Sequence, residues 1–242
     1  MTNKYMYFVA NWKMFGDLGT LNTLNKVITF VNKIKKNKFK LIYCPPSTLI
    51  YPLAKMLKKT SIEVGAQNCH ESESYGAHTG QLNSMMLKDV GAKYVILGHS
   101  ENRQSGENDR LINLKIRSAI KSGLKVIFCI GETLSEKRKK ITKKILAQQI
   151  SKGLNKIKNR KGILIAYEPV WAIGSGLIPE QSELIDTIDY IKGKVKGFKV
   201  LYGGSVNPKN INNLKNINSI DGFLIGGASQ VPNNFIDIIK KT

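Results

Sequence analysis

Cysteine, proline and acidic residues are scarce in this 242-residue sequence. Its three cysteines, Cys44, Cys69 and Cys129, are widely spaced and form no Cys-x-x-Cys pair. This spacing argues against a disulfide scaffold or a zinc ribbon and fits a reducing compartment. The 7 prolines and 21 glycines have no period of three, which excludes a collagen-like chain.

Long apolar runs are also missing. No stretch approaches the ~18 apolar residues that a membrane span requires. The N-terminal apolar run, residues 5–10, is too short for a secretory signal. We therefore expect a cytoplasmic protein without a membrane partner.

The shortage of acidic residues leaves a strong positive charge. Lys and Arg number 38 against 17 Asp and Glu, a formal net charge of +21, while the hydrophobic (42%) and charged (23%) fractions are ordinary for a folded domain. Such an excess suits either a binder of anionic surfaces or a lysine-rich exterior without a partner. No nucleic-acid-binding motif is present, so we expect no nucleic-acid partner.

Short apolar runs alternate with amphipathic stretches along the whole chain. Most runs are continuously apolar, as in strands buried on both faces. The predicted strands are residues 5–10, 40–44, 62–65, 94–97, 125–130, 163–167, 199–202 and 222–225. The predicted helices are residues 18–34, 49–57, 111–120, 141–157, 184–195, 210–214 and 235–240.

Helix punctuation supports this division. Pro179 and Pro232 stand where helices should begin, and Gly123 stands where one should end. Eight strands that alternate with helices in this length predict a closed, eight-stranded parallel (β/α)8 barrel, with residues 1–242 forming a single domain. An open doubly wound sheet is the alternative, but residues 10–14 contain no glycine-rich turn after the first strand.

Several reactive side chains follow the predicted strands, at the barrel end where active sites form. Asn11 and Lys13 follow the first strand, His99 and Glu101 the fourth, and Glu168 the sixth. A lone His or Glu in such a place is more often structural or solvated. Their convergence on one face favours a catalytic site.

Two glycine pairs follow the last two strands. They are Gly203-Gly204 and Gly226-Gly227, in the loops where barrels commonly hold phosphate through backbone N–H groups. One pair alone would suit a tight turn, whereas two pairs in these loops favour a phosphate site.

The segment after Glu168 is longer than the usual 2–6 residues of such loops. Its apolar anchors and small residues are typical of a lid that closes as a unit. The predicted lid comprises Pro169, Val170, Trp171, Ala172, Ile173, Gly174, Ser175 and Gly176.

A metal centre is not predicted. The three histidines, His70, His78 and His99, do not form a His-Glu-x-x-His motif or a cluster at ligand spacing. Cys129 follows the pattern of a buried strand-end cysteine rather than that of a nucleophile.

The motifs at residues 10–14, 98–101, 167–174, 202–206 and 221–228 resemble those of triosephosphate isomerases, and the resemblance covers essentially the whole chain. It implies a TIM barrel that interconverts dihydroxyacetone phosphate and D-glyceraldehyde 3-phosphate in glycolysis and gluconeogenesis, without metal or cofactor. Another phosphate-binding barrel isomerase or synthase is the enzyme alternative. It would share the glycine pairs but not the set of Asn11, Lys13, His99 and Glu168.

The resemblance also implies a role for each residue. Glu168 would be the base, and His99 a neutral electrophile that polarises the carbonyl. Lys13 and Asn11 would stabilise the enediolate, with Glu101 supporting Lys13. The backbone N–H groups that would hold the phosphate belong to Gly174, Ser205, Gly226 and Gly227.

The chain departs from the family pattern at two places. Gln81 and Asn102 stand where the family usually has an acidic and a basic residue that pair across a dimer interface. Because both charges are lost together, no charge is stranded, and we still expect a homodimer in which the loop carrying Thr79 reaches the partner. The end of the lid reads Leu177-Ile178-Pro179 instead of the commoner Lys-x-Ala type.

The predicted barrel also gives a position for the basic clusters. Residues 33–40, 152–161 and 192–199 each run from a helix C-terminus into the next strand, so they should lie at the barrel end away from the site and complement the helix dipoles. Residues 137–144 are an exception and should attract the phosphate ester over a longer range.

Overall fold

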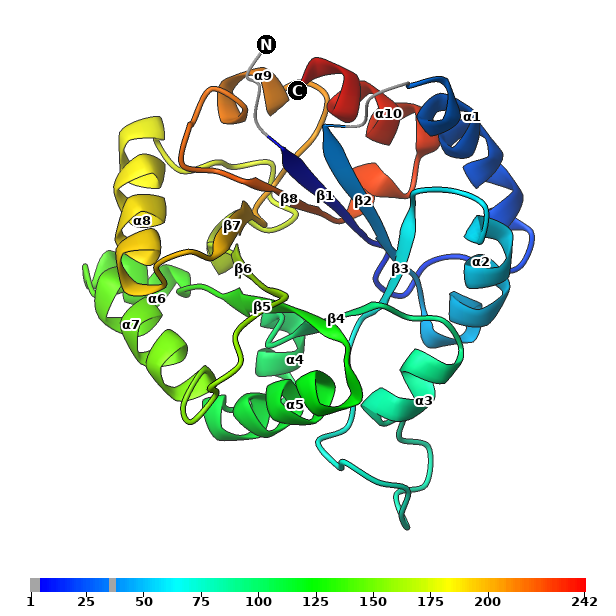
Figure 1. Cartoon of the computed structure of the whole chain (residues 1–242). Helices are drawn as coiled ribbons and strands as arrows, with labels where there is room; N and C mark the ends of the chain where they lie inside the picture. The colour runs from blue at the N-terminus through cyan, green and yellow to red at the C-terminus, as the bar shows by residue number, and fades with distance from the viewer. Residues whose placement is uncertain (1–4, 35–37) are drawn as a thin grey trace.

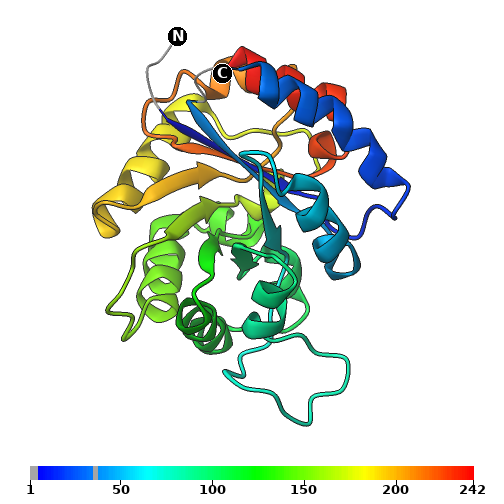
Figure 2. The same cartoon turned by 45° about the vertical axis from the view of Figure 1, so that its right-hand side comes forward.

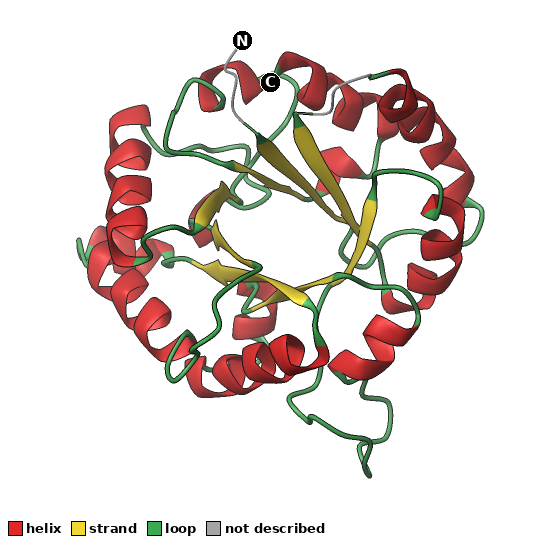
Figure 3. Ribbon diagram, in the orientation of Figure 1, coloured by secondary structure: helices red, strands yellow, loops and turns green. Residues whose placement is uncertain are grey.

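The computed structural model describes residues 5–34 and 38–242, which form a closed barrel of parallel strands inside a ring of helices (Figures 1 and 3). The strands follow one another around the barrel in sequence order, and β8 pairs with β1 to close it. They are β1 (Met6–Asn11), β2 (Phe39–Cys44), β3 (Glu63–Ala66), β4 (Tyr94–Leu97), β5 (Lys125–Ile130), β6 (Ile163–Tyr167), β7 (Lys199–Tyr202) and β8 (Gly222–Ile225). The predicted (β/α)8 barrel is confirmed, and the open doubly wound sheet is not formed.

The last five strands have the predicted bounds, while the first three differ at their ends. The predicted bounds of β1 missed Asn11, which pairs in register with Cys44 of β2. Strand ends are set by backbone pairing, and the prediction followed apolar character, which stops at Ala10.

The strands are buried on both faces because two apolar layers meet them. Adjacent residues of a strand point to opposite sides. Val9 and Ile42 fill the barrel interior, whereas Phe8 and Tyr43 pack in the layer between strands and helices. This double burial explains the continuously apolar runs in the sequence.

Helices cover the outside of the barrel. The α-helices are α1 (Asn25–Lys33), α2 (Ile50–Leu57), α3 (Ser84–Asp89), α4 (Ser100–Gln104), α5 (Asp109–Ser122), α6 (Leu134–Arg138), α7 (Thr142–Gly153), α8 (Gln181–Lys194), α9 (Ile211–Leu214) and α10 (Pro232–Lys241). The helix punctuation is confirmed: α8 begins just after Pro179, Pro232 opens α10, and Gly123 ends α5 with a left-handed φ of 86°.

Two helix predictions need correction. The predicted helix at residues 18–34 is a 3-10 helix at Thr20–Leu24 followed by α1, and the predicted helix at 141–157 ends at Gly153. The short helices α3, α4 and α6 were not predicted, since five or six residues do not complete two turns of apolar periodicity.

One connection stands out from the barrel. The loop between β3 and α3, residues 67–83, projects away from the helical ring (Figures 1 and 2). Within residues 5–34 and 38–242, no helix combines the length and apolar character needed to cross a membrane.

Candidate active site

A cavity of about 400 Å³ opens at the carboxyl ends of the strands. Its walls come from the loops after β1, β4, β6, β7 and β8. It is lined by Asn11, Lys13, His99, Glu168, Ile173, Gly174, Gly176, Gly203, Gly204, Ser205, Val206, Asn207, Leu224, Gly226, Gly227, Ala228 and Gln230. The cavity therefore brings together four of the five predicted catalytic residues and all of the predicted phosphate-binding residues.

Glu168 and His99 meet in the wall of this cavity. Glu168 Oε1 lies 3.2 Å from His99 Nε2, and Glu168 Oε2 accepts a hydrogen bond of 3.2 Å from the backbone N–H of Ser100. His99 Nδ1 accepts a hydrogen bond of 3.2 Å from the backbone N–H of Glu101. A ring nitrogen that accepts a hydrogen bond carries no proton, so this contact favours the imidazole form with its proton on Nε2, beside Glu168 Oε1.

The pKa of the Glu168 carboxyl group is set by opposing influences. Burial raises its pKa, while His99, the Ser100 N–H, the Cys129 thiol and Lys13 act in the opposite direction. The net result is a raised pKa. A carboxylate that is costly to keep charged is a stronger base than an exposed one.

Lys13 reaches the same cavity from a strained backbone. Its φ is 55°, an uncommon conformation for a residue with a side chain. The backbone is held by Asn11, whose Oδ1 accepts from Lys13 N at 3.1 Å, and by Gln67, whose Nε2 donates to Lys13 O at 2.8 Å. Lys13 Nζ pairs with Glu101 Oε1 at 2.5 Å. Glu101 therefore touches Lys13 but does not line the cavity.

The two glycine pairs meet different surroundings. A Cβ on Gly203 would lie 2.8 Å from Cγ of Glu168, and one on Gly204 would lie 2.2 Å from the Tyr202 hydroxyl oxygen. The first pair is thus explained by packing inside the protein. A Cβ on Gly227 would meet nothing within 4 Å, so the second pair leaves room on the cavity side.

The predicted lid crosses the cavity from Glu168 to the loop after β7. It contains a short 3-10 helix, Val170–Ala172, which was not predicted. The Ser205 hydroxyl donates to Ala172 O at 2.7 Å and accepts from Gly176 N at 3.2 Å. Ile173, Gly174 and Gly176 line the cavity, whereas the other lid residues, Pro169, Val170, Trp171, Ala172 and Ser175, do not.

A buried glutamate for which no role was predicted anchors the lid. Glu132, buried after β5, accepts from Trp171 Nε1 at 2.9 Å and from the Tyr167 hydroxyl at 3.2 Å. Burial raises the pKa of Glu132. Lys137 Nζ lies 3.9 Å from the centroid of the Trp171 ring and does not line the cavity.

Further supporting residues were missed by sequence reasoning. Gln67 and Gln230 bind backbone groups of the loop after β1, which lines the cavity, and Gln149 binds Gly131 in the segment after β5. Only the position of Glu132 directly after a strand could have drawn attention to it, because a single glutamine in a loop or helix leaves no pattern.

Other predicted residues lie outside the cavity. Thr79 is exposed on the projecting loop, where Gln81 is exposed as well. Among the described residues, no group of three or more His, Cys, Asp or Glu is arranged to hold a metal ion. Cys44, Cys69 and Cys129 are free and buried.

Comparisons with known proteins identify close relatives of this chain. The family model described as triosephosphate isomerase matches residues 6–242. A triosephosphate isomerase of Thermodesulfovibrio yellowstonii is 40% identical to this chain, and the match covers 97% of this chain and 98% of the relative. A triosephosphate isomerase of Zygosaccharomyces bailii is 41% identical, and the match covers 92% of this chain and 93% of the relative. The crystal structure of triosephosphate isomerase from Bartonella henselae superposes with a TM-score of 0.88 at 31% identity and covers 98% of both chains.

Proposed function

The chain belongs to the triosephosphate isomerase family and interconverts dihydroxyacetone phosphate and D-glyceraldehyde 3-phosphate, and we propose that Glu168 is the base of this reaction. Family membership decides between the two enzyme alternatives, since another phosphate-binding barrel isomerase or synthase would belong elsewhere. The observation that carries the proposal is the buried Glu168 carboxyl 3.2 Å from His99 Nε2 at the cavity wall.

Glu168 would remove a proton from the carbon beside the substrate carbonyl and return it to the neighbouring carbon. Such a carbon acid is weak, so the reaction needs a desolvated carboxylate as well as stabilisation of the resulting enediolate. Burial of Glu168 meets the first need, because the raised pKa makes the carboxylate more basic.

His99 would polarise the carbonyl and move protons between the two substrate oxygens. A neutral imidazole is the electrophile in this family generally. The N–H of Glu101 supports that form here, since it occupies the lone pair of His99 Nδ1 and leaves the Nε2 proton to donate into the cavity.

Lys13 and Asn11 would stabilise the enediolate charge. Lys13 is the ammonium that lines the cavity, and its pairing with Glu101 orients the side chain. Asn11, beside it, offers an amide as a hydrogen-bond donor.

The phosphate would bind to backbone N–H groups of Gly174, Ser205, Gly226 and Gly227, all of which line the cavity. The lid, residues 169–176, would close over it and exclude water, because an enediolate exposed to solvent expels its phosphate. These groups of the chain itself would bind the substrate.

A coupled assay of glyceraldehyde 3-phosphate conversion tests the assignment of the base. Glu168→Asp withdraws the carboxylate by one methylene, and we expect turnover to fall at least ~100-fold with little change in inhibition by inorganic phosphate. Glu168→Gln should abolish activity. Glu180→Gln is a matched control, since Glu180 is exposed and its side chain caps no helix. Near-normal turnover of Glu168→Asp would refute the assignment.

We also propose that two copies form a homodimer through the projecting loop. The loop after β1 and the projecting loop both expose apolar side chains: Met14 is 100% exposed next to Lys13, and Tyr75 is 71% exposed on the loop that carries Thr79. Exposed patches of this kind are typical of interaction surfaces. Insertion of Thr79 and its loop beside the partner's Asn11 and Lys13 would cover both.

The remaining features of the proposal concern the whole chain. Residues 1–242 would form one domain, and the enzyme would act in the cytoplasm, in gluconeogenesis as well as in glycolysis. Three free, buried cysteines are compatible with a reducing compartment. Localisation of a tagged chain by cell fractionation tests this assignment.

A further inference from the structure

The backbone of Glu168 is held by the segment that follows β5. Glu168 N donates to Ile130 O at 2.8 Å, and Val170 N donates to Glu132 O at 3.0 Å. Between these two hydrogen bonds the backbone segments at Gly131 and Glu168 are in contact, since a Cβ on Gly131 would lie 1.7 Å from the Glu168 carbonyl oxygen. The position of Glu168 therefore depends on the position of Gly131.

Gly131 is itself held by two hydrogen bonds from a side chain outside the barrel. Gln149 of α7 accepts from Gly131 N at 2.8 Å through Oε1 and donates to Gly131 O at 3.0 Å through Nε2. Gln149 is only 9% exposed, so neither backbone group would find water easily if the amide were removed. A primary amide presents its carbonyl acceptor and an N–H donor side by side in one plane, which matches the two groups of Gly131.

The helix that carries Gln149 is fixed against β5. A Cβ on Gly153, the last residue of α7, would lie 2.3 Å from Cζ of Phe128 on β5. This close approach holds the end of the helix against the strand. Gln149 thus grips Gly131 from a rigid support rather than from a loop.

The same grip extends to the lid. Gly131 is followed directly by Glu132, whose carboxylate accepts from Trp171 and Tyr167. A shift of Gly131 would therefore move both the backbone of Glu168 and the anchor of the lid. In Figure 1, α7 lies in the ring of helices outside β5.

We propose that Gln149 is a positioning residue that sets the location of Glu168 through Gly131. This inference rests on the proposed role of Glu168 as base. Gln149 touches no reacting atom, and its effect on turnover passes through the backbone. Displacement of a reacting group by about 1 Å costs on the order of 100-fold in rate. Loss of the two hydrogen bonds from Gln149 to Gly131 should therefore lower kcat more than it changes KM.

The test compares Gln149→Leu, Gln149→Glu and the control Gln148→Glu. Leu fills similar space but makes neither hydrogen bond. Glu keeps the acceptor for Gly131 N, but it can donate to Gly131 O only when protonated. Gln148 is the exposed neighbour of Gln149 on the same helix, so its substitution controls for charge on α7.

We measure kcat and KM for glyceraldehyde 3-phosphate from about pH 8 to about pH 6, with the folded fraction followed by circular dichroism. In both Gln149 variants kcat should fall about tenfold or more, while KM stays within about threefold. The kcat of Gln149→Glu relative to wild type should recover as the pH falls, because burial raises the pKa of the introduced carboxyl and protonation restores a donor. The kcat of Gln149→Leu relative to wild type should not change with pH, and Gln148→Glu should have the kcat and KM of wild type.

A wild-type kcat in folded Gln149→Leu would overturn the proposal, as would a pH-independent ratio for Gln149→Glu. A purely structural role predicts a lower melting temperature with unchanged kcat in the folded protein. Glu168→Asp, assayed alongside, separates the two assignments. Normal turnover in Glu168→Asp rejects Glu168 as the base. If Glu168→Asp is impaired while the Gln149 variants turn over normally, only the positioning role of Gln149 is rejected.

Discussion

At the scale of single residues, burial of Glu168 links catalysis to stability. The carboxyl lies among His99, the Ser100 N–H and the Cys129 thiol, and its pKa is raised above the ordinary value of 4.5 because burial outweighs these contacts. The folded protein therefore binds this proton more tightly than the unfolded chain does. The charge that makes Glu168 a strong base thus opposes folding at neutral pH.

The pH dependence of stability should reveal this opposition. For a carboxyl with a raised folded-state pKa, the free energy of unfolding falls as the pH rises from the unfolded value through the folded-state pKa, and it stays lower above that pH. Glu168→Gln removes the group. We therefore expect the melting temperature of the variant, minus that of wild type, to increase from about pH 4.5 to about pH 7.5 in differential scanning calorimetry. The control Glu180→Gln should show a constant difference, and a constant difference in Glu168→Gln would contradict the prediction.

Individual residues were predictable where the barrel topology fixes their place. Asn11, Lys13, His99 and Glu168 each follow a strand, so a parallel barrel brings them together whatever the helices do. Gln149 carried no such signal. It lies eighteen positions from Gly131, and only the docking of α7 on β5 brings the two into contact.

At the scale of elements, the lid is tied down at both ends by different chemistry. At its start, Trp171 bonds to the buried Glu132 and lies beneath the Lys137 ammonium. At its other end, the Ser205 hydroxyl joins Ala172 O and Gly176 N. Loss of the second tie should weaken closure without disturbing the anchor at Glu132.

Ser205→Ala removes both hydrogen bonds of that tie. We expect kcat to fall about 30-fold, because the two lost hydrogen bonds contribute about 1 kcal/mol each. A larger share of the enediolate should also lose its phosphate, since water reaches it more often. Release of inorganic phosphate per turnover measures this share. In the control Ser175→Ala, a lid hydroxyl that accepts from Leu177 N within the lid segment itself is lost, and release at the wild-type level is expected there. Equal release in the two variants would show that Ser205 does not secure the lid.

The elements themselves were predictable to different degrees. Strands buried on both faces leave apolar runs that cannot be missed, as in β4 to β8. The amphipathic residues 18–34 kept helical spacing, but they contain a 3-10 helix, Thr20–Leu24, before α1. Apolar spacing near three or four residues fits either helix type, so periodicity could not separate them.

At the scale of the whole molecule, the charge of +21 is offset locally where acidic residues pair with lysines. The buried Asp221 carboxylate pairs with Lys192 and Lys199 just before β8, and Glu63 pairs with Lys40 and Lys93 at the start of β3. Both acids lie at the amino ends of the strands, where the basic clusters were expected, although residues 35–37 of the first cluster lie outside the described residues.

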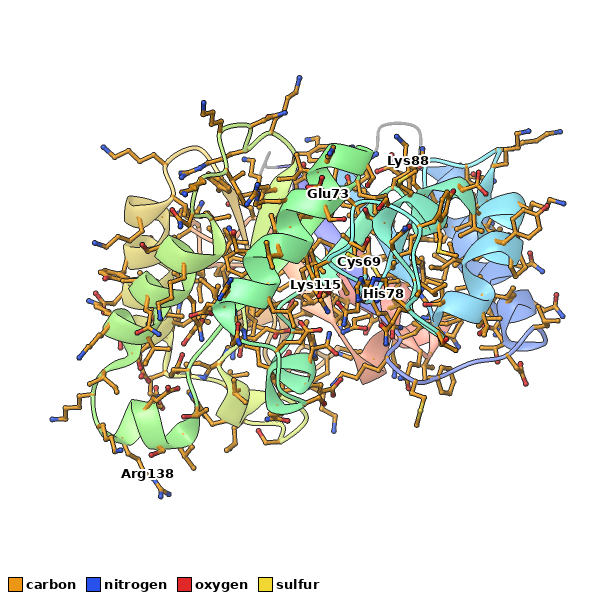
Figure 4. The ribbon with its side chains drawn as sticks, turned by 90° about the horizontal axis from the view of Figure 1, so that it is seen from below. Cys69, Glu73, His78, Lys88, Lys115 and Arg138 are labelled. Carbon is orange, nitrogen blue, oxygen red and sulfur yellow. The ribbon has the colours of Figure 1, made fainter. Side chains whose placement is uncertain are left out.

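Other cationic side chains differ in their surroundings. Arg138 points away from the barrel, whereas Lys115 lies inside, where it pairs with Glu107 (Figure 4). In the 137–144 cluster, Lys137 pairs with Glu183 and Lys143 with Asp186. These pairs bind α6 and α7 to α8. The long-range attraction of substrate by this cluster remains a prediction.

The same charge sets how the proposed homodimer should respond to salt. Two chains of +21 repel each other on association, and the neutral Gln81 and Asn102 offer no ion pair across the interface to offset that repulsion. Salt screens like charges over a Debye length of about 10 Å at 0.1 M, while the exposed Met14 and Tyr75 would contribute apolar contacts that screening does not weaken. We therefore expect sedimentation at micromolar protein to show a dimer whose dissociation constant falls as KCl is raised. A constant that rises with salt would mean that attractive ion pairs hold the interface, and monomer alone at every salt concentration would refute the dimer.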